Sequence, residues 1–356
     1  MALMPPRIVA ASAAFPPHRH AQAAIREAVR AHWGDIEERE LDVFGNAGVE
    51  TRSLGFPLDY YFAGHGFGRR NRDYQELGLA LGERAIREAL ARAGLDPADV
   101  GHLVFVTTTG LATPSLDAIL AGRLGLPARV ARTPLFGAGC AGGAVGVAKA
   151  ADGLRGRPDS VAVVLSVELC GQTFLAHDRR KANVVASALF GDGAAAAVLV
   201  GSARAAGTPG LDVVDSRSEL LPGSLDLMGW DFVDEGFRLL LSPRIPAEAK
   251  TTIAPRIAAY ACEGDDEPVA HWLLHPGGPR VLDGLAAGLG LDDGDLRWSR
   301  DVLRRQGNLS SATVLVALAD FLEGAAPAEG DRAMLAAVGP GFAIEATRLR
   351  WRAGGR

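Results

Sequence analysis

Residues 135–154 read LFGAGCAGGAVGVAKAADGL, a short apolar run that leads through glycines and Cys140 into small residues at helix-compatible spacing. Such a turn places the cysteine sulfur at a helix N-terminus, where free N–H groups and the helix dipole favour the thiolate. The same local pattern also fits a small cysteine buried where helices cross. The stretch therefore predicts a turn into a helix, with a candidate nucleophile at the turn.

Outward from this stretch, strand-like runs rich in Val, Leu and Ile alternate with helix-length amphipathic segments. The clearest helix is expected from Asp73 to Ala93, with Gly94 as its stop signal. This alternation predicts an α/β protein built in layers. The strand-like runs are His102–Thr107, Val161–Val167, Ala194–Val200, His271–His275 and Arg332–Val338.

The chain has 356 residues, enough for two domains or for one large duplicated fold. Glycine and proline gather between Ala205 and Gly210, and the LDVVDS that follows looks like a new strand. We place a boundary there, which divides the chain into halves at 1–205 and 206–356. No repeat of about 20–50 residues is visible, which argues against a solenoid.

Composition excludes several classes of partner. The net charge of -5 gives no general attraction to nucleic acid or to an anionic membrane, and neither a signal peptide nor a membrane span is expected. The three cysteines cannot form a disulfide framework and no His/Cys cluster has zinc spacing, so no metal is expected and a reducing cytoplasm fits best. Because only three lysines are present, arginine must supply nearly all contacts to an anionic ligand.

Two further residues carry chemistry. His275 ends a strand-like run in HWLLHPGGPRVLD, residues 271–283, where it suits a base or a partner for a thiolate, although a lone histidine is more often a satisfied core or turn residue. Asn308 precedes a helix-like run in GNLSSATVL, residues 307–315, where it either caps the helix or donates to a developing oxyanion. With Cys140 they are the parts of activated-thiol acyl chemistry, although spacing alone does not show that they converge.

Five separated motifs resemble those of type III polyketide synthases, the chalcone-synthase-like family, and they occur in that family's order. The match runs through most of the chain from about residue 100. It implies a thiolase-like α/β fold, with two pseudo-duplicated halves in a layered αβαβα arrangement, and a homodimer. The motifs are TPLFGAGCAGG (133–143), SALFGDGAAAAVLVG (187–201), LLHPGGPRVLD (273–283), GNLSSATVL (307–315) and AVGPGFAIEATRL (337–349).

The resemblance also implies a role for each candidate residue, because the family's Cys, His and Asn fall on Cys140, His275 and Asn308. It implies that a Cys140 thiolate, held by the imidazolium of His275, takes an acyl group from acyl-CoA. His275 and Asn308 then donate to the thioester oxygen of malonyl-CoA, and the enolate left by loss of CO2 attacks the acyl-enzyme. Acyl-CoA and malonyl-CoA are substrates in this reaction, and no separate cofactor is implied.

By the same resemblance, Phe190 is a gatekeeper between a CoA tunnel and an internal cavity, and Leu239 stands near the place of a second gatekeeping Phe. The loop usually written GFGPG reads AVGPG here, so that an aromatic residue is missing. The residues expected to bind CoA are Arg280, Arg52, Gly277 and Gly278. The other residues expected to contact the substrate are Thr108, Thr173, Cys170, Glu168, Trp230 and Ser310.

The starter is expected to be a medium-chain or long-chain fatty acyl-CoA, released as an alkylpyrone or alkylresorcinol. This expectation comes from DLMGWDFVDEGF, residues 226–237, and VELCGQTF, residues 167–174, which look like bacterial members of the family with aliphatic starters. The alternative within the family is a malonyl-primed synthase of the tetrahydroxynaphthalene or phloroglucinol type.

Other classes of protein remain open at this point. An initiating ketoacyl-carrier-protein synthase has the same Cys, His and Asn, but usually shows an HQAN-like turn where this chain has HPGG. A catalytically silent scaffolding subunit would keep the fold, although the intact Cys, His and Asn argue against it. A thiol hydrolase would release free fatty acid without consuming malonyl-CoA.

Overall fold

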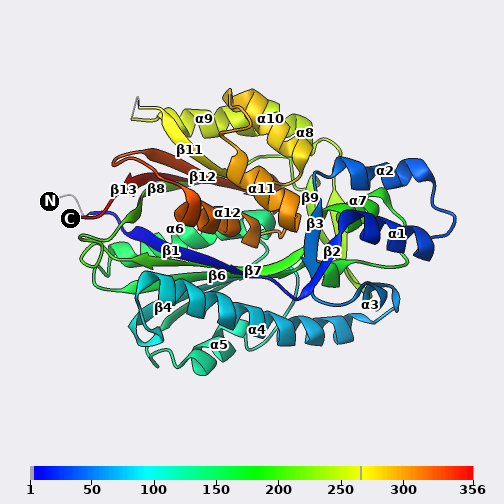
Figure 1. Cartoon of the computed structure of the whole chain (residues 1–356), viewed down its shortest axis with the longest axis horizontal. Coiled ribbons are helices and arrows are strands. Elements are labelled where there is room, and N and C mark those ends of the chain that lie inside the picture. The colour runs from blue at the N-terminus through cyan, green and yellow to red at the C-terminus, as the bar shows by residue number, and fades with distance from the viewer. Residues whose placement is uncertain (1–3, 265–266, 356) are drawn as a thin grey trace.

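The computed structural model describes residues 4–264 and 267–355, and in this part of the chain nine strands form one mixed sheet (Figure 1). Four other strands pair into two small sheets. The strands are β1 (Arg7–Ala14), β2 (His18–Ala21), β3 (Thr51–Leu54), β4 (Val100–Thr107), β5 (Ala131–Phe136), β6 (Val161–Leu169), β7 (Asp192–Val200), β8 (Gly210–Leu220), β9 (Met228–Val233), β10 (Gly236–Leu241), β11 (Val269–Leu274), β12 (Arg332–Gly339) and β13 (Ala343–Arg352).

Helices cover the outer faces of the sheet and fill the space between its two halves (Figure 1). The α-helices are α1 (Gln22–His32), α2 (Glu38–Asn46), α3 (Leu58–Phe62), α4 (Phe67–Ala93), α5 (Leu116–Leu124), α6 (Gly142–Arg155), α7 (Lys181–Leu189), α8 (Ile245–Glu248), α9 (Ala254–Cys262), α10 (Pro279–Leu289), α11 (Arg297–Gln306) and α12 (Ala312–Gly324). Short 3-10 or π segments are η1 (Pro97–Asp99), η2 (Gly139–Ala141), η3 (Cys170–Thr173), η4 (Ala249–Ile253) and η5 (Pro340–Phe342).

The order of the strands shows a repeated topology. The strand order in the sheet is β11-β12-β13-β8-β1-β7-β6-β4-β5. Counted outward from β1 in one half and from β8 in the other, each half begins with two antiparallel strand pairs, and a parallel pair follows. Within the sheet, β1 of the first half pairs with β8 of the second half, through Arg7 with Asp212 and Ile8 with Leu211. The expected division at 205/206 lies in the connection between β7 and β8.

Alternating side chains of the central strands enter different hydrophobic cores. In β4, Val104 and Val106 pack in the central core with α6 and α12, whereas Leu103 and Phe105 face α4 and α5. In the other half, β12 divides its side chains between the central core and a third core that includes α9 and α10. The result is a five-layer αβαβα arrangement, and strands buried on both faces explain the continuous apolar runs in the sequence.

The two central helices approach each other closely. A Cβ atom built on Gly143 of α6 would lie 2.3 Å from the carbonyl oxygen of Ser311, which precedes α12, so only glycine fits there. Because Cys140 precedes α6 and Asn308 precedes α12, this contact brings the two segments to the same region of the molecule.

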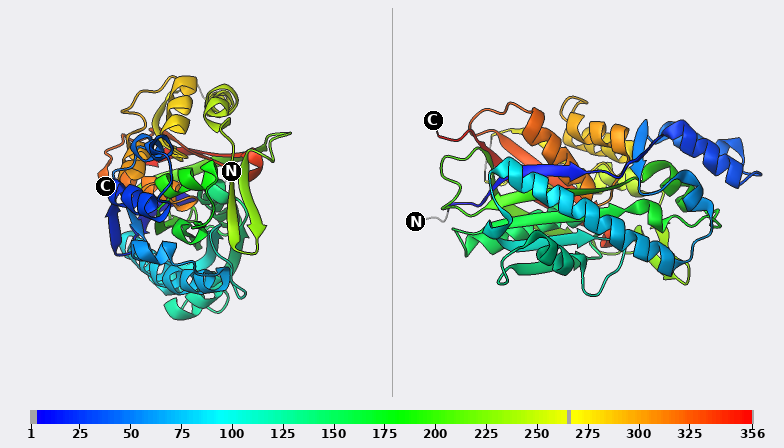
Figure 2. Two further views of the ribbon diagram at one scale, coloured as in Figure 1. Left: turned by 90° about the vertical axis from the view of Figure 1, so that its right-hand side faces the viewer. Right: turned by 60° about the horizontal axis from the view of Figure 1, so that its bottom comes forward.

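The predicted strand-like runs are strands in the structure, with ends that differ by a few residues. The predicted helix at 73–93 begins earlier, at Phe67, and crosses the outer face of β1, β6 and β7 (Figure 2). Its first turns, FGRRNR, lack apolar periodicity, so the pattern gave no signal for them. None of the described helices combines the length and the hydropathy that a membrane span requires.

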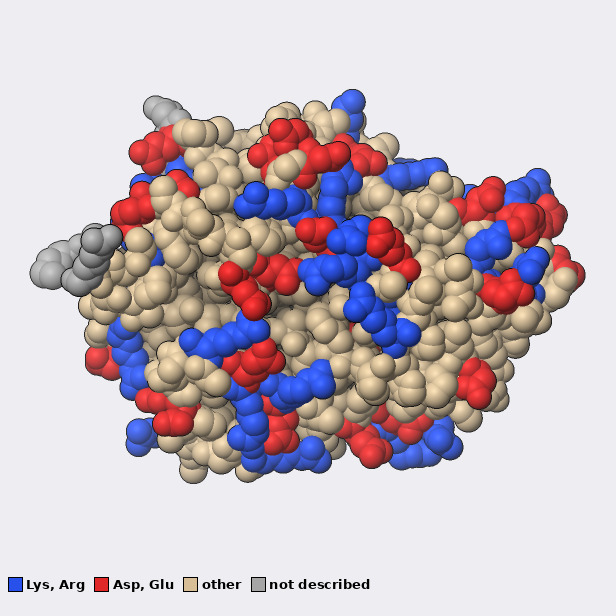
Figure 3. All heavy atoms as spheres, viewed as in Figure 1, with Lys and Arg blue, Asp and Glu red and all other residues tan. Residues whose placement is uncertain are grey.

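Acidic and basic side chains are interspersed on the face of the molecule that Figure 3 shows. A mixed surface of this kind produces no extended field of one sign on that face. Recognition of an anionic ligand there would depend on a local group of cations.

Candidate active site

Cys140, His275 and Asn308 line one cavity of about 730 Å³. The three residues come from three separate segments: η2 at the start of α6, the end of β11, and the turn between α11 and α12. The structure therefore brings together the three residues that the sequence could not place relative to one another.

Cys140 lies in the 3-10 turn that leads directly into α6, which is the helix N-terminal position expected from the sequence. Its Sγ lies 3.7 Å from Ser310 Oγ. Burial raises the pKa of the Cys140 thiol to about 11, and the nearby Glu168 carboxylate adds to this rise. The thiol in the free protein is therefore protonated at neutral pH.

His275 follows β11 and is held by its backbone, whose N–H donates to Ala336 O at 2.8 Å. Its side chain is buried, and neither ring nitrogen has a hydrogen-bond partner among the described residues. Burial lowers the pKa of His275 to about 3, so the imidazole is neutral. Burial thus disfavours the charged forms of both members of the expected thiolate–imidazolium pair, which stays a prediction.

The carboxamide of Asn308 is held at both ends. Its Oδ1 accepts from the backbone N–H of Ser310 at 2.7 Å, and its Nδ2 donates to Gly277 O at 3.3 Å. One N–H of the amide therefore remains for a ligand in the cavity. Ser310 has a positive φ of 50°, a conformation that only strong local hydrogen bonds maintain in a residue other than glycine.

The cavity lining includes exposed charged residues of both signs, among them the acidic Glu40 and Asp42. Arg280 lies there with two cations that the sequence analysis did not select, Arg39 and Lys181. All three side chains are exposed. The available signal for Lys181 was the basic run Arg179–Lys181 before a helix-like segment. Gly277 and Gly278 also line this cavity.

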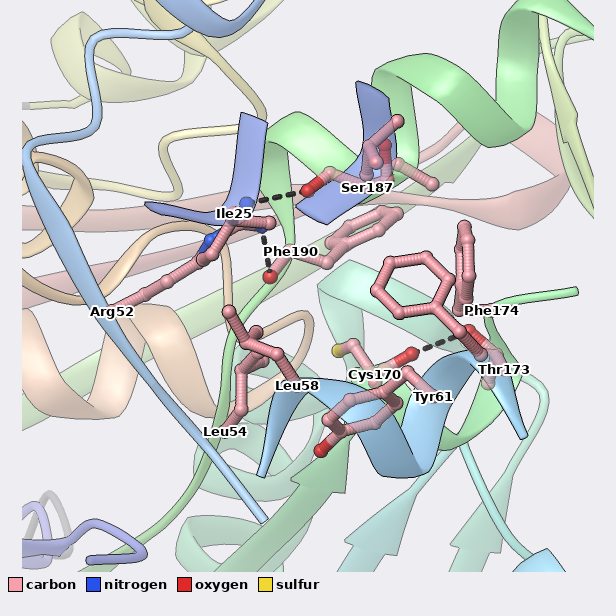
Figure 4. Close-up of a pocket in the computed structure, with 14 residues that line it drawn as sticks. Ile25, Arg52, Leu54, Leu58, Tyr61, Cys170, Thr173, Phe174, Ser187 and Phe190 are labelled. Carbon is pink, nitrogen blue, oxygen red and sulfur yellow. Dashed lines mark hydrogen bonds between the residues drawn. The ribbon is translucent and has the colours of Figure 1, made fainter. Parts of the chain in front are cut away.

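Phe190 separates the main cavity from a smaller apolar one of about 50 Å³ (Figure 4). Cys170 and Thr173 line the small cavity together with Phe174 and Tyr61, and their contact with substrate stays a prediction. At roughly 10–15 Å³ per water, the empty space holds only a few water molecules.

Glu168 is fully buried beneath the site instead of lining it. Its Oε2 accepts from Thr108 N at 3.0 Å and from Thr109 Oγ1 at 2.7 Å, and its Oε1 accepts from Ser311 Oγ. Burial raises the pKa of Glu168 to about 7. The carboxyl group ties the ends of β4 and β6 to the segment that precedes α12.

Several of the predicted substrate contacts need correction. Thr108, Glu168, Trp230, Leu239 and Ser310 line neither of these two cavities. Trp230 donates from Nε1 to Thr108 Oγ1 at 3.3 Å. Ser310 Oγ lies 3.7 Å from the sulfur of Cys140.

The second gatekeeper position also differs from the expectation. Leu239 pairs with Trp230 within the β9–β10 hairpin and is not among the residues that line the cavity, which Met228 and Leu241 of the same hairpin line instead. Residues two apart on a strand share a face, but the twisted hairpin presents only its end to the cavity.

The CoA-binding expectation for Arg52 is wrong. Its side chain is 1% exposed, and its guanidinium donates to Phe190 O and Ser187 O (Figure 4) and also to Gln22 Oε1. A guanidinium that is buried, with both terminal nitrogens bonded inside the protein, does not reach a phosphate at the surface.

Two family models match the chain: the N-terminal domain of chalcone and stilbene synthases over residues 69–204 and their C-terminal domain over residues 212–351. A 1,3,6,8-tetrahydroxynaphthalene synthase from Streptomyces peucetius subsp. caesius is 42% identical over 358 residues, which cover 97% of this chain and 93% of that protein. A 3,5-dihydroxyphenylacetyl-CoA synthase from Streptomyces toyocaensis is 32% identical, covering 97% of this chain and 90% of that protein.

A solved structure has the same fold. The 1,3,6,8-tetrahydroxynaphthalene synthase from Streptomyces coelicolor A3(2), described as a bacterial type III polyketide synthase, superposes with a TM-score of 0.93 at 30% identity. The superposition covers 98% of this chain and all of that chain.

Proposed function

Because the chain belongs to the chalcone and stilbene synthase family, the type III polyketide synthases, we propose that it uses malonyl-CoA both to start and to extend its product. As a type III polyketide synthase it is an acyltransferase that joins acyl-CoA and malonyl-CoA by decarboxylating Claisen condensation. The observation that supports malonyl priming is the 42% identity to a tetrahydroxynaphthalene synthase over nearly the whole chain.

A tetrahydroxynaphthalene product has simple carbon arithmetic. Naphthalene has ten ring carbons, and each malonyl unit contributes two after loss of CO2, so five malonyl-CoA molecules supply the whole skeleton. No other starter is then needed. The proposal therefore replaces the expected fatty acyl starter with the malonyl-primed alternative.

We assign the loading step to Cys140 and His275. His275 takes the proton of the Cys140 thiol, and the sulfur attacks the thioester carbonyl of a CoA substrate. The bond from that carbonyl to the CoA sulfur breaks, and the CoA thiolate recovers the proton from His275. N–H groups at the start of α6 support the negative sulfur while it exists.

We assign decarboxylation to Asn308 with His275. The malonyl thioester oxygen gains negative charge as the carboxylate leaves as CO2, and the free N–H of Asn308 Nδ2 donates to it. The resulting enolate carbon attacks the Cys140 thioester and displaces the sulfur. Because the amide orientation is already fixed by Ser310 and Gly277, little rearrangement is needed when charge develops.

The small cavity behind Phe190, of about 50 Å³, does not limit the starter, because Cys140 lines the main cavity of about 730 Å³. The fatty acyl starter and the alkylpyrone product thus stay predictions without support from the relatives named above.

The experiment is to supply malonyl-CoA alone, with a Cys140→Ala variant as control, and to identify products by mass spectrometry. We expect wild-type protein to consume malonyl-CoA and release an aromatic product with the mass of tetrahydroxynaphthalene. Product only after addition of acyl-CoA with more than six carbons would refute malonyl priming. Turnover with malonyl-carrier protein but not malonyl-CoA would instead favour the ketoacyl-carrier-protein synthase alternative.

We also propose that the protein is a homodimer whose two copies contact each other along the edge strand β5. Phe136 at the end of β5 is 46% exposed and lies 6.4 Å, between ring centroids, from Phe232, which is 58% exposed. Exposed aromatic residues beside an open strand edge favour association with a second copy.

Replacing Phe136 by glutamate is expected to shift the protein from dimer to monomer in light scattering at micromolar concentration. The control is Val214→Glu, on an exposed residue of β8, which four strands separate from β5 in the sheet order. A monomeric wild-type protein, or a Phe136→Glu protein that stays dimeric, would contradict this interface.

A further inference from the structure

The C-terminal end of α7 is capped by side chains and backbone from distant segments. The last carbonyl groups of a helix have no partner within the helix and need donors from elsewhere. Here each of them has one. The pairs are Ala186 O with Phe190 N, Ser187 O with Arg52 Nη2, Ala188 O with Gln22 Nε2, Leu189 O with Asn308 N, and Phe190 O with Arg52 Nη1.

Arg52 is the centre of this cap. Its Nη1 lies 2.6 Å from Phe190 O, and its Nη2 donates to Ser187 O (Figure 4). Its Nη2 also donates to Gln22 Oε1 at 3.0 Å. Gln22 in turn donates to Ala188 O at 2.7 Å. A cation at the negative end of a helix dipole is well placed electrostatically, although burial lowers the pKa of Arg52 to about 9.

Two residues of the active site adjoin the C-terminal end of α7. Phe190 follows α7 directly and forms the wall between the two cavities. Asn308 pairs with it as an isolated bridge: Asn308 N donates to Leu189 O at 2.8 Å, and Gly191 N donates to Asn308 O at 3.0 Å. Any shift of the helix end therefore moves the Phe190 ring and the Asn308 amide together.

Close backbone contacts surround the bridge between Phe190 and Asn308. A Cβ built on Gly191 would lie 2.3 Å from Gln306 O, and one built on Gly307 would lie 2.6 Å from Leu189 O. Gly307 also has a φ of +70°, which other residues rarely adopt. The position of this bridge is thus set by the backbone on one side and by Arg52 on the other.

We propose that Arg52 is a positioning residue for the reaction: by capping α7 it sets the place of the Asn308 amide for decarboxylation and of the Phe190 wall for product length. The inference rests on the role proposed for Asn308. Arg52 itself touches neither substrate nor the Cys140 sulfur.

The test replaces Arg52 by methionine, which keeps most of the length but removes every donor. Because a misplacement of about 1 Å costs roughly 100-fold, we expect kcat for malonyl-CoA decarboxylation to fall by roughly 10- to 100-fold with KM nearly unchanged. The rate of Cys140 alkylation should stay within about twofold of wild type, because the sulfur does not depend on this cap. Arg52→Lys, which keeps the charge but not the forked geometry, should recover part of the rate.

The matched control is Arg7→Met. Arg7 is also buried, at 6% exposed, and donates to Asp212 and to the carbonyls of Ala205 and Thr208, in the connection between the halves. This variant should lower the melting temperature at least as much while leaving kcat unchanged. A folded Arg52→Met protein with wild-type kcat and wild-type products, or equal loss of kcat in Arg7→Met, would overturn the proposal.

A second variant covers the case in which Arg52→Met does not fold. Gln22→Met removes the donor to Ala188 O and one partner of Arg52, and should give the same loss of kcat on a smaller scale. Wild-type kcat in Gln22→Met would then count against the proposal. If Asn308→Ala alone kept full decarboxylation, the role of Asn308 would fail instead, and altered product length in the Arg52 variants would remain as evidence for the cap.

Discussion

Replacing Asn308 by alanine is expected to slow malonyl-CoA decarboxylation by about 100- to 1000-fold, the usual cost of removing one oxyanion donor. The amide is 2% exposed and its orientation is set by Ser310 N and Gly277 O, so it is a preorganised donor. Loading of Cys140 depends on the sulfur and on His275, and should change much less. The measurement is release of CO2 from malonyl-CoA, beside transfer of a labelled acyl group to the protein.

The control for this prediction is Asn183→Ala. Asn183 is 4% exposed, and its amide donates to Leu175 O and Asp178 O, away from the cavity lining. Loss of stability alone should therefore appear in this variant without selective loss of decarboxylation. Equal loss of loading and decarboxylation in Asn308→Ala would contradict the role assigned to the amide.

Replacing His275 by glutamine is expected to reduce both half-reactions at neutral pH, in the loading step by about 100- to 10,000-fold. Burial raises the pKa of Cys140 to about 11, so the thiol stays protonated unless a base takes its proton. Burial lowers the pKa of His275 to about 3, which favours the neutral form of its ring at neutral pH. Removal of the ring leaves the sulfur in its unreactive form.

The pH dependence of Cys140 alkylation provides a further test of the role of His275. A thiol with a raised pKa becomes a thiolate only as the pH approaches that pKa, so alkylation of Cys140 in His275→Gln should be slow at pH 7 and rise steeply with pH. The difference from wild type should then narrow at high pH, because the base is no longer needed. His271→Gln, on the same strand and bonded to Asp331 at 3.1 Å, is the control. Rapid alkylation of His275→Gln at pH 7 would show that another group activates the sulfur.

The corrected residues share one physical reason. Arg52 and Glu168 were expected at the substrate from their neighbours in sequence, but each of them is buried and bonded to a segment distant in the chain. A buried charge is retained where its hydrogen bonds are satisfied inside the protein. Which partners satisfy it depends on packing between segments, and a single sequence does not reveal that packing.

The cations at the cavity mouth illustrate the same limit. Arg39 and Lys181 come from α2 and α7, in parts of the chain that nothing in the sequence brings together. Each alone is indistinguishable from an ordinary surface charge. Only their common position around a cavity that contains Cys140 makes them candidates for contacts to a CoA phosphate.

Short-range rules were sufficient for the strands buried on both faces, for the helix start at Cys140, and for the identity of the sulfur, imidazole and amide, because periodicity and turn chemistry act over a few neighbouring residues. Folding was needed to show that these three groups share a cavity, that burial disfavours the charged forms of the thiol and the imidazole, and that Arg52 caps a helix instead of binding phosphate. Desolvation and hydrogen-bond satisfaction depend on every atom packed around a group, and most of those atoms come from residues far away in the chain.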